Sequence, residues 1–237
     1  MQTDKVLLVP YKADVERDKI FDAWKKLGGR VQRIDKFWER PANLQNQKVA
    51  IYGNDTFALV LAQVLDVQLI SPDDLIIARL DKKWTKRSVV QKKIREVTEN
   101  DLPGFIKPSV PKQFKAGIYH HLKELLEETN GISSEEILLL SEIVDVKAEA
   151  RGFVLEGALK DLALYEGSVD LETGKEFLNA FLKNENGKFP KTFVVDIGFN
   201  HELGWYIIEF NSSWGAGLNN CQPEKVIECI VEATEKN

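Results

Sequence analysis

The sequence of 237 residues has few of the side chains that build disulfide-linked or metal-clamped scaffolds. It has two cysteines, Cys221 and Cys229, so a disulfide framework is excluded and a reducing, cytoplasmic setting is favoured. Its three histidines are His120, His121 and His201, two of them adjacent. Such a set predicts neither a zinc site nor a histidine-based catalytic triad.

Long apolar runs and an excess of positive charge are missing as well. No run is long enough to span a bilayer and the first residues lack a signal-peptide pattern, so we expect no membrane partner. The formal net charge of −5 argues against nucleic acid as a partner, because phosphate neutralisation needs a positive surface. With 43 % hydrophobic and 29 % charged residues, the composition is that of a soluble globular protein.

Residues 1–80 predict a small α/β domain. Apolar runs alternate with stretches of helical periodicity, which predicts a mostly parallel sheet. The turn at 52–55 lies where such sheets bind ligands. The expected strands are 5–9, 31–34, 48–53 and 67–71, and the expected helices are 14–27 and 56–65.

A basic run at 81–95 opens the next part of the chain, with seven positive residues and one acid. Such a run is usually a solvated helix face, although one or two of its lysines are candidates for phosphate binding. A short strand at 102–109 presents Lys107 and leads into a basic loop, which we expect to be mobile. A helix at 119–129 with Leu122, Leu125 and Leu126 inward, and a buried strand at 136–144, follow.

The C-terminal part predicts a hairpin at 152–167 that turns at 156–157, a helix at 174–186 and a closing helix at 223–235. Between the two helices, the segment 194–218 predicts a second hairpin with one apolar face. If residues 202–203 form its turn, residues whose numbers sum to 405 face each other.

That second hairpin carries three oxygen-bearing side chains. Asp196 then lies across from Glu209, with Asn211 two residues further along the same face. Two carboxylates that close repel each other unless a cation or a proton lies between them. Three hard oxygen ligands suit Mg²⁺. The alternative is a solvated strand face with ordinary polar residues, although the glycines at 215 and 217 favour the metal site.

Five motifs from Asp81 onward resemble, in order, those of the ATP-grasp superfamily. They are Asp81-Lys82 at a helix start, Lys107 in FIKP, Glu142 in LSEIV, Glu149-x-Arg151, and Asp196 followed by Glu209-Phe-Asn211. The wording of FIKP, KQFxAG and ExRGFV is most similar to a clade marked by two arginines and one lysine, often found in bacteria and phages. The resemblance implies an α/β (α+β) ATP-grasp fold after a Rossmann-like pre-ATP-grasp domain. The domains would be 1–80, a central lobe at 81–141 and a C-terminal lobe with the metal site at 142–237.

The resemblance also implies roles for individual residues, with ATP and Mg²⁺ as cofactors and Mn²⁺ as the alternative metal. ATP would lie between the lobes at 81–141 and 142–237. The implied contacts are Lys107 and Lys82 to the phosphates, Glu142, Ile143 and Val144 to adenine, Glu149 to ribose, and Asp196, Glu209 and Asn211 to the metal. Arg151 would act in catalysis with Lys107, on a phosphate or an acyl-phosphate oxyanion. Phosphate contacts from Lys83, Lys86, Arg87 and Lys115 are left open.

Three of these roles have a plainer alternative. Lys107 could extend from a strand edge into solvent, and Glu142 could be an exposed strand end. Glu149 and Arg151 could form only a local surface ion pair. One position also departs from the family: where related ligases often have an arginine two residues before the first metal acid, this chain has Val194. Either Arg151 or a lysine takes over that task, or the substrate differs.

We therefore expect an ATP- and Mg²⁺-dependent ligase that joins a carboxylate to an amine or a similar nucleophile through an acyl phosphate. The carboxylate partner would be a small molecule or a peptide. The alternatives are a phosphotransferase acting on a small alcohol, a peptide-tagging enzyme, and a nucleotide-binding module without catalysis. The oligomeric state is left open.

Overall fold

The computed structural model describes residues 4–45, 47–185 and 187–236. The chain forms two compact units. Unit 1 comprises Met1–Pro72, Ala148–Ile197 and Glu209–Asn237, and unit 2 comprises Asp73–Lys147 and Gly198–Ile208. Within the described residues, every helix is too short or too polar to cross a bilayer. The division into three domains at 80 and 141 stays a prediction.

The first part of unit 1 is the expected parallel sheet, with strand order β2-β1-β3. The central strand β1 is buried on both faces. Leu7 and Val9 share a core with Trp24 of α1, whereas Leu8 packs in a second core with Phe57 of α2. The bounds are β1 Val6–Pro10, α1 Val15–Lys26, β2 Arg30–Ile34, β3 Val49–Ile51 and α2 Asp55–Leu65.

Both helices begin at a side-chain cap that the sequence contains. Asp14 accepts a hydrogen bond of 3.1 Å from the backbone N–H of Arg17, and Asn54 accepts one of 3.0 Å from that of Phe57. Such caps satisfy N–H groups that have no partner within the helix. The carboxyl ends of β1 and β3 therefore lead directly into ordered helix N-termini.

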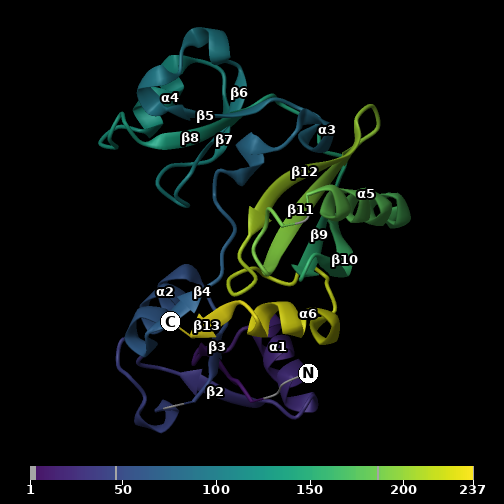
Figure 1. Ribbon diagram of the computed structural model, residues 1–237. Helices are drawn as coiled ribbons and strands as arrows, with labels where there is room; N and C mark the ends of the chain where they lie inside the picture. Colours follow the sequence, from purple (N-terminus) through teal and green to yellow (C-terminus); the bar gives the residue numbers. More distant parts are fainter. Residues whose placement is uncertain (1–3, 46, 186, 237) are drawn as a thin grey trace. The chain divides into compact units, whose positions relative to one another are not determined.

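The end of the chain differs from the prediction. The closing helix α6 (Pro223–Val231) stops four residues before the expected end, and β13 (Thr234–Lys236) follows it. This strand pairs antiparallel with β4 (Val67–Leu69), which is therefore not part of the parallel sheet. The Thr234 hydroxyl also accepts a hydrogen bond of 3.0 Å from the backbone N–H of Ile51. Pairing with a distant strand thus replaces the last helical turn, and in Figure 1 the C-terminus lies beside β4.

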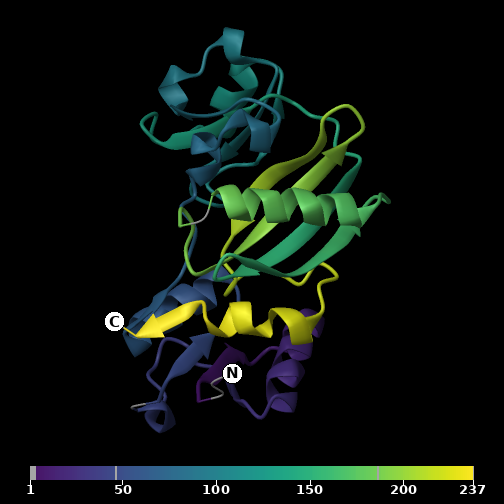
Figure 2. The ribbon, with the colours of Figure 1, turned by 45° about the vertical axis from the view of Figure 1, so that its right-hand side comes forward.

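A second sheet has the strand order β10-β9-β11-β12. Its first hairpin turns at Glu156 and Gly157, as expected, and both residues have positive φ (52° and 74°). Figure 2 shows α5 lying across this sheet. The bounds are β9 Ala148–Leu155, β10 Ala158–Glu166, α5 Leu171–Asn184, β11 Thr192–Asn200 and β12 Gly204–Asn211.

Strand β11 departs from the expected alternation, because residues 192–198 are buried on both faces. On one face, Phe193 stacks with Phe189, 4.8 Å between ring centroids, in an aromatic cluster that includes Phe181 of α5. On the other, Val194 belongs to the core cluster that contains Ile227 of α6. The two-residue turn was wrong: three residues, 201–203, separate β11 from β12.

Unit 2 is built on an antiparallel sheet with strand order β5-β8-β6-β7. One face packs on α4, where Leu125 shares a core with Ile106 and Leu138. The bounds are α3 Lys82–Thr85, β5 Val89–Lys93, β6 Gly104–Pro108, β7 Gly117–Tyr119, α4 Leu122–Glu128 and β8 Ile137–Ser141. Short 3₁₀ turns complete the two units at Ala42–Leu44, Ile76–Arg79, Ile94–Glu96 and Glu99–Asp101.

The interpretation of 81–95 as mainly one helix face was wrong. Asp81 caps α3 as expected, but the helix ends after four residues at Lys86, whose φ is 53°. The chain then enters β5, where Val89 and Val90 pair with β8. Two adjacent β-branched residues favour a strand, and the pairing with β8 makes use of it.

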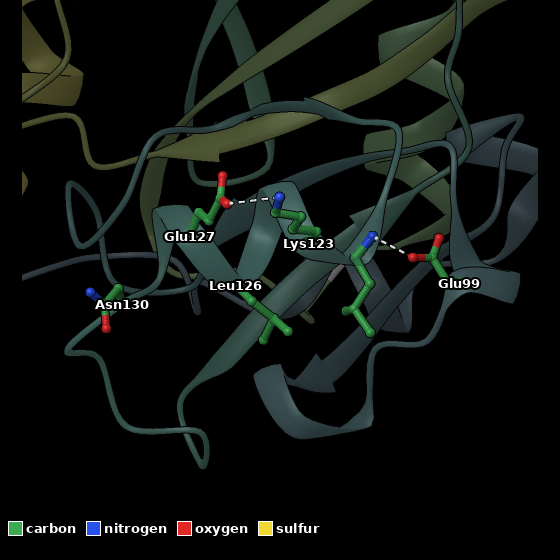
Figure 3. Close-up of a pocket in the computed structure, with 6 residues that line it drawn as sticks. Glu99, Lys123, Leu126, Glu127 and Asn130 are labelled. Atoms are coloured by element: carbon green, nitrogen blue, oxygen red, sulfur yellow. Dashed lines mark hydrogen bonds and ion pairs between the residues drawn. The ribbon is translucent and has the colours of Figure 1, made fainter.

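Helix α4 is also shorter than predicted, and Leu126 is 52 % exposed rather than inward. Leu126 lines a shallow hollow of about 460 Å³, together with Glu99, Leu122, Lys123, Glu127 and Asn130 (Figure 3). Glu99 accepts a hydrogen bond of 3.1 Å from the N–H of Leu122 at the helix start. The six lining residues include none of the predicted site residues.

Asp101 allows a pH-dependent test of unit 2. It accepts hydrogen bonds from Lys92 (2.5 Å) and from the N–H and hydroxyl of Thr98 (2.8 and 3.0 Å). Burial raises the pKa of Asp101, but these hydrogen bonds outweigh burial and lower the pKa below its usual value. We expect Asp101→Asn to reduce the free energy of unfolding by about 1 kcal/mol at pH 7.

Because the folded-state pKa is lowered, this stabilisation is present above the ordinary aspartate pKa and is lost as the pH falls through the folded-state value. Urea unfolding at pH 7 and at about pH 3 should therefore show a difference that shrinks with acidity. Asp22→Asn, at an exposed acid of α1, is the control. A difference that stays constant down to the lower pH contradicts the assignment.

Candidate functional site

The centre of the site is an ion pair between neighbouring strands β9 and β11. Arg151 donates from Nε to Asp196 Oδ1 (2.8 Å) and from Nη2 to Oδ2 (2.6 Å). Its third nitrogen, Nη1, donates to the backbone carbonyl of Gly217 (3.0 Å). Asp196 is 1 % exposed. The pair is therefore bidentate and almost fully removed from water, the geometry in which a guanidinium–carboxylate contact is strongest.

The other two predicted metal ligands join this pair from β12. Asn211 Nδ2 lies 3.3 Å from Asp196 Oδ2 and 3.1 Å from Glu209 Oε1, and donates a hydrogen bond to each. The structure thus brings Asp196, Glu209 and Asn211 together, although their role as metal ligands stays a prediction.

The chemistry of these donors suits a hard divalent cation. Two carboxylates and an amide meet, and at present N–H groups of Arg151 and Asn211 face the carboxylate oxygens where a cation would otherwise neutralise them. Rotating the Asn211 amide by a half-turn would present its oxygen instead. Among the described residues, no group of three or more His, Cys, Asp or Glu side chains is placed to hold a metal, so the amide is an essential part of the set.

Burial controls the charge balance of the pair. It raises the pKa of Asp196 above its usual value, and the hydrogen bonds from Arg151 oppose this effect. For Arg151, burial acts to lower the pKa, but the bonds and the charge of Asp196 raise it above its ordinary value. Arg151 therefore stays charged and is the counter-ion that keeps an acid at this buried position.

Glu149 and Arg151 do not pair with each other in the way the plain alternative requires. The Glu149 carboxylate accepts a short hydrogen bond from the Tyr165 hydroxyl of β10, while Arg151 pairs with Asp196. The Arg151 guanidinium lies 6.0 Å from the centroid of the Tyr165 ring. Burial, and then the bond to Glu149, raise the pKa of Tyr165. Tyr165 thus connects the predicted ribose acid to the arginine.

Sequence reasoning missed Tyr165, and the geometry explains why. The register between β9 and β10 shifts between Leu164 and Glu166, so Tyr165 lies at an irregularity of the ladder. Such an extra residue redirects a side chain, and simple alternation cannot place it. An aromatic residue with a hydroxyl on a strand opposite two charged residues was the available signal.

Val194, the position that departs from the family pattern, is a core residue. It is fully buried in the cluster that contains Phe153 and Ile230. A guanidinium there would lose its hydration without a carboxylate designed to receive it. In this chain the arginine beside Asp196 comes instead from the neighbouring strand, as Arg151.

In unit 2, Lys107 lies on one face of the antiparallel sheet. The strand register pairs Lys107 with Leu139 and Phe105 with Ile118, and in each pair the two side chains share a face. Phe105 and Ile118 are 37 % and 49 % exposed on that face. A positive charge beside exposed apolar side chains is a surface on which a base and its phosphates can both be accommodated.

Glu142, Ile143 and Val144 follow directly after β8. Glu142 is not a loose strand end, because its N–H donates to the Ser88 carbonyl (3.1 Å) and its carboxylate accepts from the Ser88 N–H (2.7 Å). The second bond lowers the pKa of Glu142. Lys82 Nζ lies 3.6 Å from the same carboxylate, in an exposed pair that adds little stability.

Arg87, one of the open phosphate candidates, is used on the backbone. It donates to the carbonyls of Thr85 (3.1 Å) and Ile207 (2.8 Å) and lies over the Tyr206 ring at 5.2 Å. β12 is an edge strand, and Arg87 satisfies a carbonyl just before Glu209. Lys83 lies over the ring of Trp84, and Lys115 lines a hollow with three glutamates of α4.

Comparison with known families agrees with this geometry. Residues 84–229 match a family model described as an ATP-grasp domain, the second family of its clade. The match covers more than half of the chain, and the protein therefore belongs to this ATP-grasp family. No curated protein sequence matches the chain.

Solved structures with low sequence identity share the fold. A RimK domain ATP-grasp protein from Sphaerobacter thermophilus has a TM-score of 0.63 at 12 % identity, covering 96 % of this chain and 98 % of that one. N5-carboxyaminoimidazole synthetase from Staphylococcus aureus, complexed with ADP, gives 0.61 at 12 %, covering 99 % and 78 %. D-alanine–D-alanine ligase from Bacillus anthracis, complexed with ATP, gives 0.56 at 10 %, covering 98 % and 97 %. The fold is thus that of an ATP-grasp protein.

Proposed function

We propose that this protein is an ATP- and Mg²⁺-dependent ligase that joins a carboxylate to an amine or a similar nucleophile. The observation that carries the proposal is the meeting of Asp196, Glu209 and Asn211 beside the buried Arg151, in a chain of the ATP-grasp family. Two of the structures that share the fold are described as complexes with ATP or ADP. One of them is a ligase and the other a synthetase.

Unit 2 contributes groups for the nucleotide. Lys107 and Lys82 would neutralise phosphate charge, a task suited to compact ammonium groups. Phe105 and Ile118, exposed on the same sheet face as Lys107, would contact the base, with Glu142, Ile143 and Val144 offering backbone groups. In unit 1, Glu149 would accept both ribose hydroxyls once Tyr165 shares it.

Unit 1 contributes the groups for phosphoryl transfer. Asp196, Glu209 and Asn211 would hold Mg²⁺, which when bound supplies charge neutralisation and Lewis acidity toward phosphate oxygens. Arg151 would bind a phosphate or acyl-phosphate oxygen with the planar donors that now bind Asp196. No covalent nucleophile from the protein is required, because positioning and electrostatics carry phosphoryl transfer.

The reaction proceeds in two steps. A carboxylate oxygen of the substrate attacks the γ-phosphorus of ATP, the bond to the β-phosphate oxygen breaks, and ADP leaves. The amine then attacks the acyl carbon, the bond from that carbon to the phosphate oxygen breaks, and phosphate leaves with a proton lost from nitrogen. The product is an amide.

A trapping assay tests the proposal. The protein is incubated with ATP, Mg²⁺, a mixture of the twenty protein amino acids and dipeptides as carboxylates, and hydroxylamine as the nucleophile. A ligase should form hydroxamate and ADP in equal amounts, and only with magnesium present. ADP without hydroxamate, with a phosphorylated alcohol as the product, favours a phosphotransferase. Tight ATP binding without ADP release across broad substrate pools favours a binding module and contradicts the proposal.

Lys107 provides a specific prediction within unit 2. We expect Lys107→Met to lower kcat/KM for ATP by about 100-fold, because a charge directed at the phosphates is lost. The measurement is ADP release in the trapping assay at varied ATP. The matched control is Lys123→Met on α4, whose side chain is 85 % exposed. Equal activity of the two variants would remove Lys107 from the site.

A further inference from the structure

The loop that follows β12 is held by contacts from several elements of unit 1. Gly53 donates its N–H to the Trp214 carbonyl (3.0 Å), and the Tyr52 hydroxyl donates to the Ala216 carbonyl (3.0 Å). Arg151 binds the Gly217 carbonyl, and the Glu16 carboxylate accepts the N–H of Leu218 at 3.1 Å. Residues 214–218 are thus fixed between the N-terminal α/β elements and the arginine that binds Asp196.

Glu16 reaches this loop only because residue 217 is a glycine. A Cβ at Gly217 would lie 2.7 Å from Glu16 Oε2, closer than real Cβ contacts allow. The requirement is one of space, since a side chain there would displace the carboxylate. Glu16 lies in the first turn of α1, a half-buried position fixed by the Asp14 cap and by Ile20 in the core. Helix α1 therefore presents a rigidly placed acceptor to the loop.

We propose that Glu16 is a positioning residue for the ligase site. By accepting the Leu218 N–H, it holds the Gly217 carbonyl where Arg151 Nη1 meets it, and this contact orients the two nitrogens that face Asp196. The catalytic consequence rests on the proposed function. The N-terminal α/β elements thereby contribute to the reaction centre through the backbone of a loop.

The competing role for Glu16 is direct, as a negative charge that binds a cationic amine of the substrate. The two roles differ in what glutamine can replace. The amide introduced by Glu16→Gln retains an oxygen that can accept the Leu218 N–H, but it carries no charge. Positioning therefore predicts that Glu16→Gln behaves like the parent protein, whereas charge recognition predicts that it behaves like Glu16→Ala.

The test combines amide hydrogen exchange with the trapping assay on full-length variants. We expect Glu16→Ala to speed exchange within residues 212–220 about tenfold, because one hydrogen bond is lost. Hydroxamate formation from the amino-acid mixture should fall at least about tenfold, with KM for ATP unchanged. Gly217→Ala should reproduce both effects while Glu16 is retained. Glu16→Gln should keep slow exchange and at least about half of the rate.

The matched control is Asp18→Ala, which removes another acid of the same helical turn; Asp18 pairs with Arg33 of β2. It should leave exchange within 212–220 unchanged. Unchanged exchange in Glu16→Ala, full turnover despite faster exchange, or Glu16→Gln matching Glu16→Ala would each overturn the proposal. If the parent protein forms no hydroxamate, the proposed function fails, while the exchange comparison still decides whether Glu16 holds the loop.

Discussion

Glu209→Gln should lower Mg²⁺-dependent ADP release at least about 100-fold, because a charged oxygen ligand is replaced by a neutral one. The introduced glutamine keeps an oxygen that can accept from Asn211, so the local hydrogen bond survives. Glu209 is only half-buried, and we expect the free energy of unfolding to change by less than about 1 kcal/mol. The assay is hydroxamate and ADP formation at varied Mg²⁺, with Mn²⁺ binding followed by electron paramagnetic resonance.

The matched control is Glu202→Gln, an exposed acid in the turn between β11 and β12. It should leave Mn²⁺ affinity and ADP release unchanged. Glu209→Gln with unaltered Mn²⁺ affinity would show that β12 does not hold the metal. Lost turnover together with a large loss of stability would instead assign Glu209 to the fold.

Asp196→Ala should have its largest effect on stability. It leaves the Arg151 guanidinium buried without its carboxylate, and removal of one partner of a buried pair costs about 3–5 kcal/mol. Chemical denaturation at pH 7 measures this directly. The activity of Asp196→Ala alone is therefore a poor test of metal binding, because an unfolded chain is inactive for any reason.

The double variant Asp196→Leu with Arg151→Met separates the two effects. Replacing a buried ion pair by apolar side chains of similar size is often neutral or stabilising, so its unfolding free energy should return to within about 1 kcal/mol of the parent. Turnover should stay absent. A double variant as unstable as Asp196→Ala would mean that the pair is needed for the fold itself, and retained turnover would remove both residues from the site.

The sequence predicts well wherever the interacting residues are near in the chain. The caps at Asp14, Asn54 and Asp81 lie within three residues of the N–H groups that they accept, and the turn at 156–157 needs only a residue tolerant of positive φ and a glycine. The meeting of Asp196 with Glu209 and Asn211 also follows from a local hairpin, although the turn length was wrong.

Features that depend on distant partners could not be predicted in this way. The basic run becomes β5 because β8 supplies its pairing, and the end of the last helix becomes β13 because β4 does. Tyr165 reaches Glu149 at an irregular position of the ladder, and Glu16 reaches Leu218 across most of the chain. In each case a non-local contact overrides, or adds to, what local pattern indicates.

The shared core of α1 and α6 has a consequence for synthesis of the protein. Leu7, Ile20 and Trp24 are covered by Val226, Ile227 and Ile230, so the apolar surface of the earliest helix remains uncovered until the ribosome has released the last one. Residues 73–147 are nearly continuous and can collapse well before that moment. Nascent chains should therefore depend on chaperones chiefly through their amino-terminal segment, which waits longest for its partner.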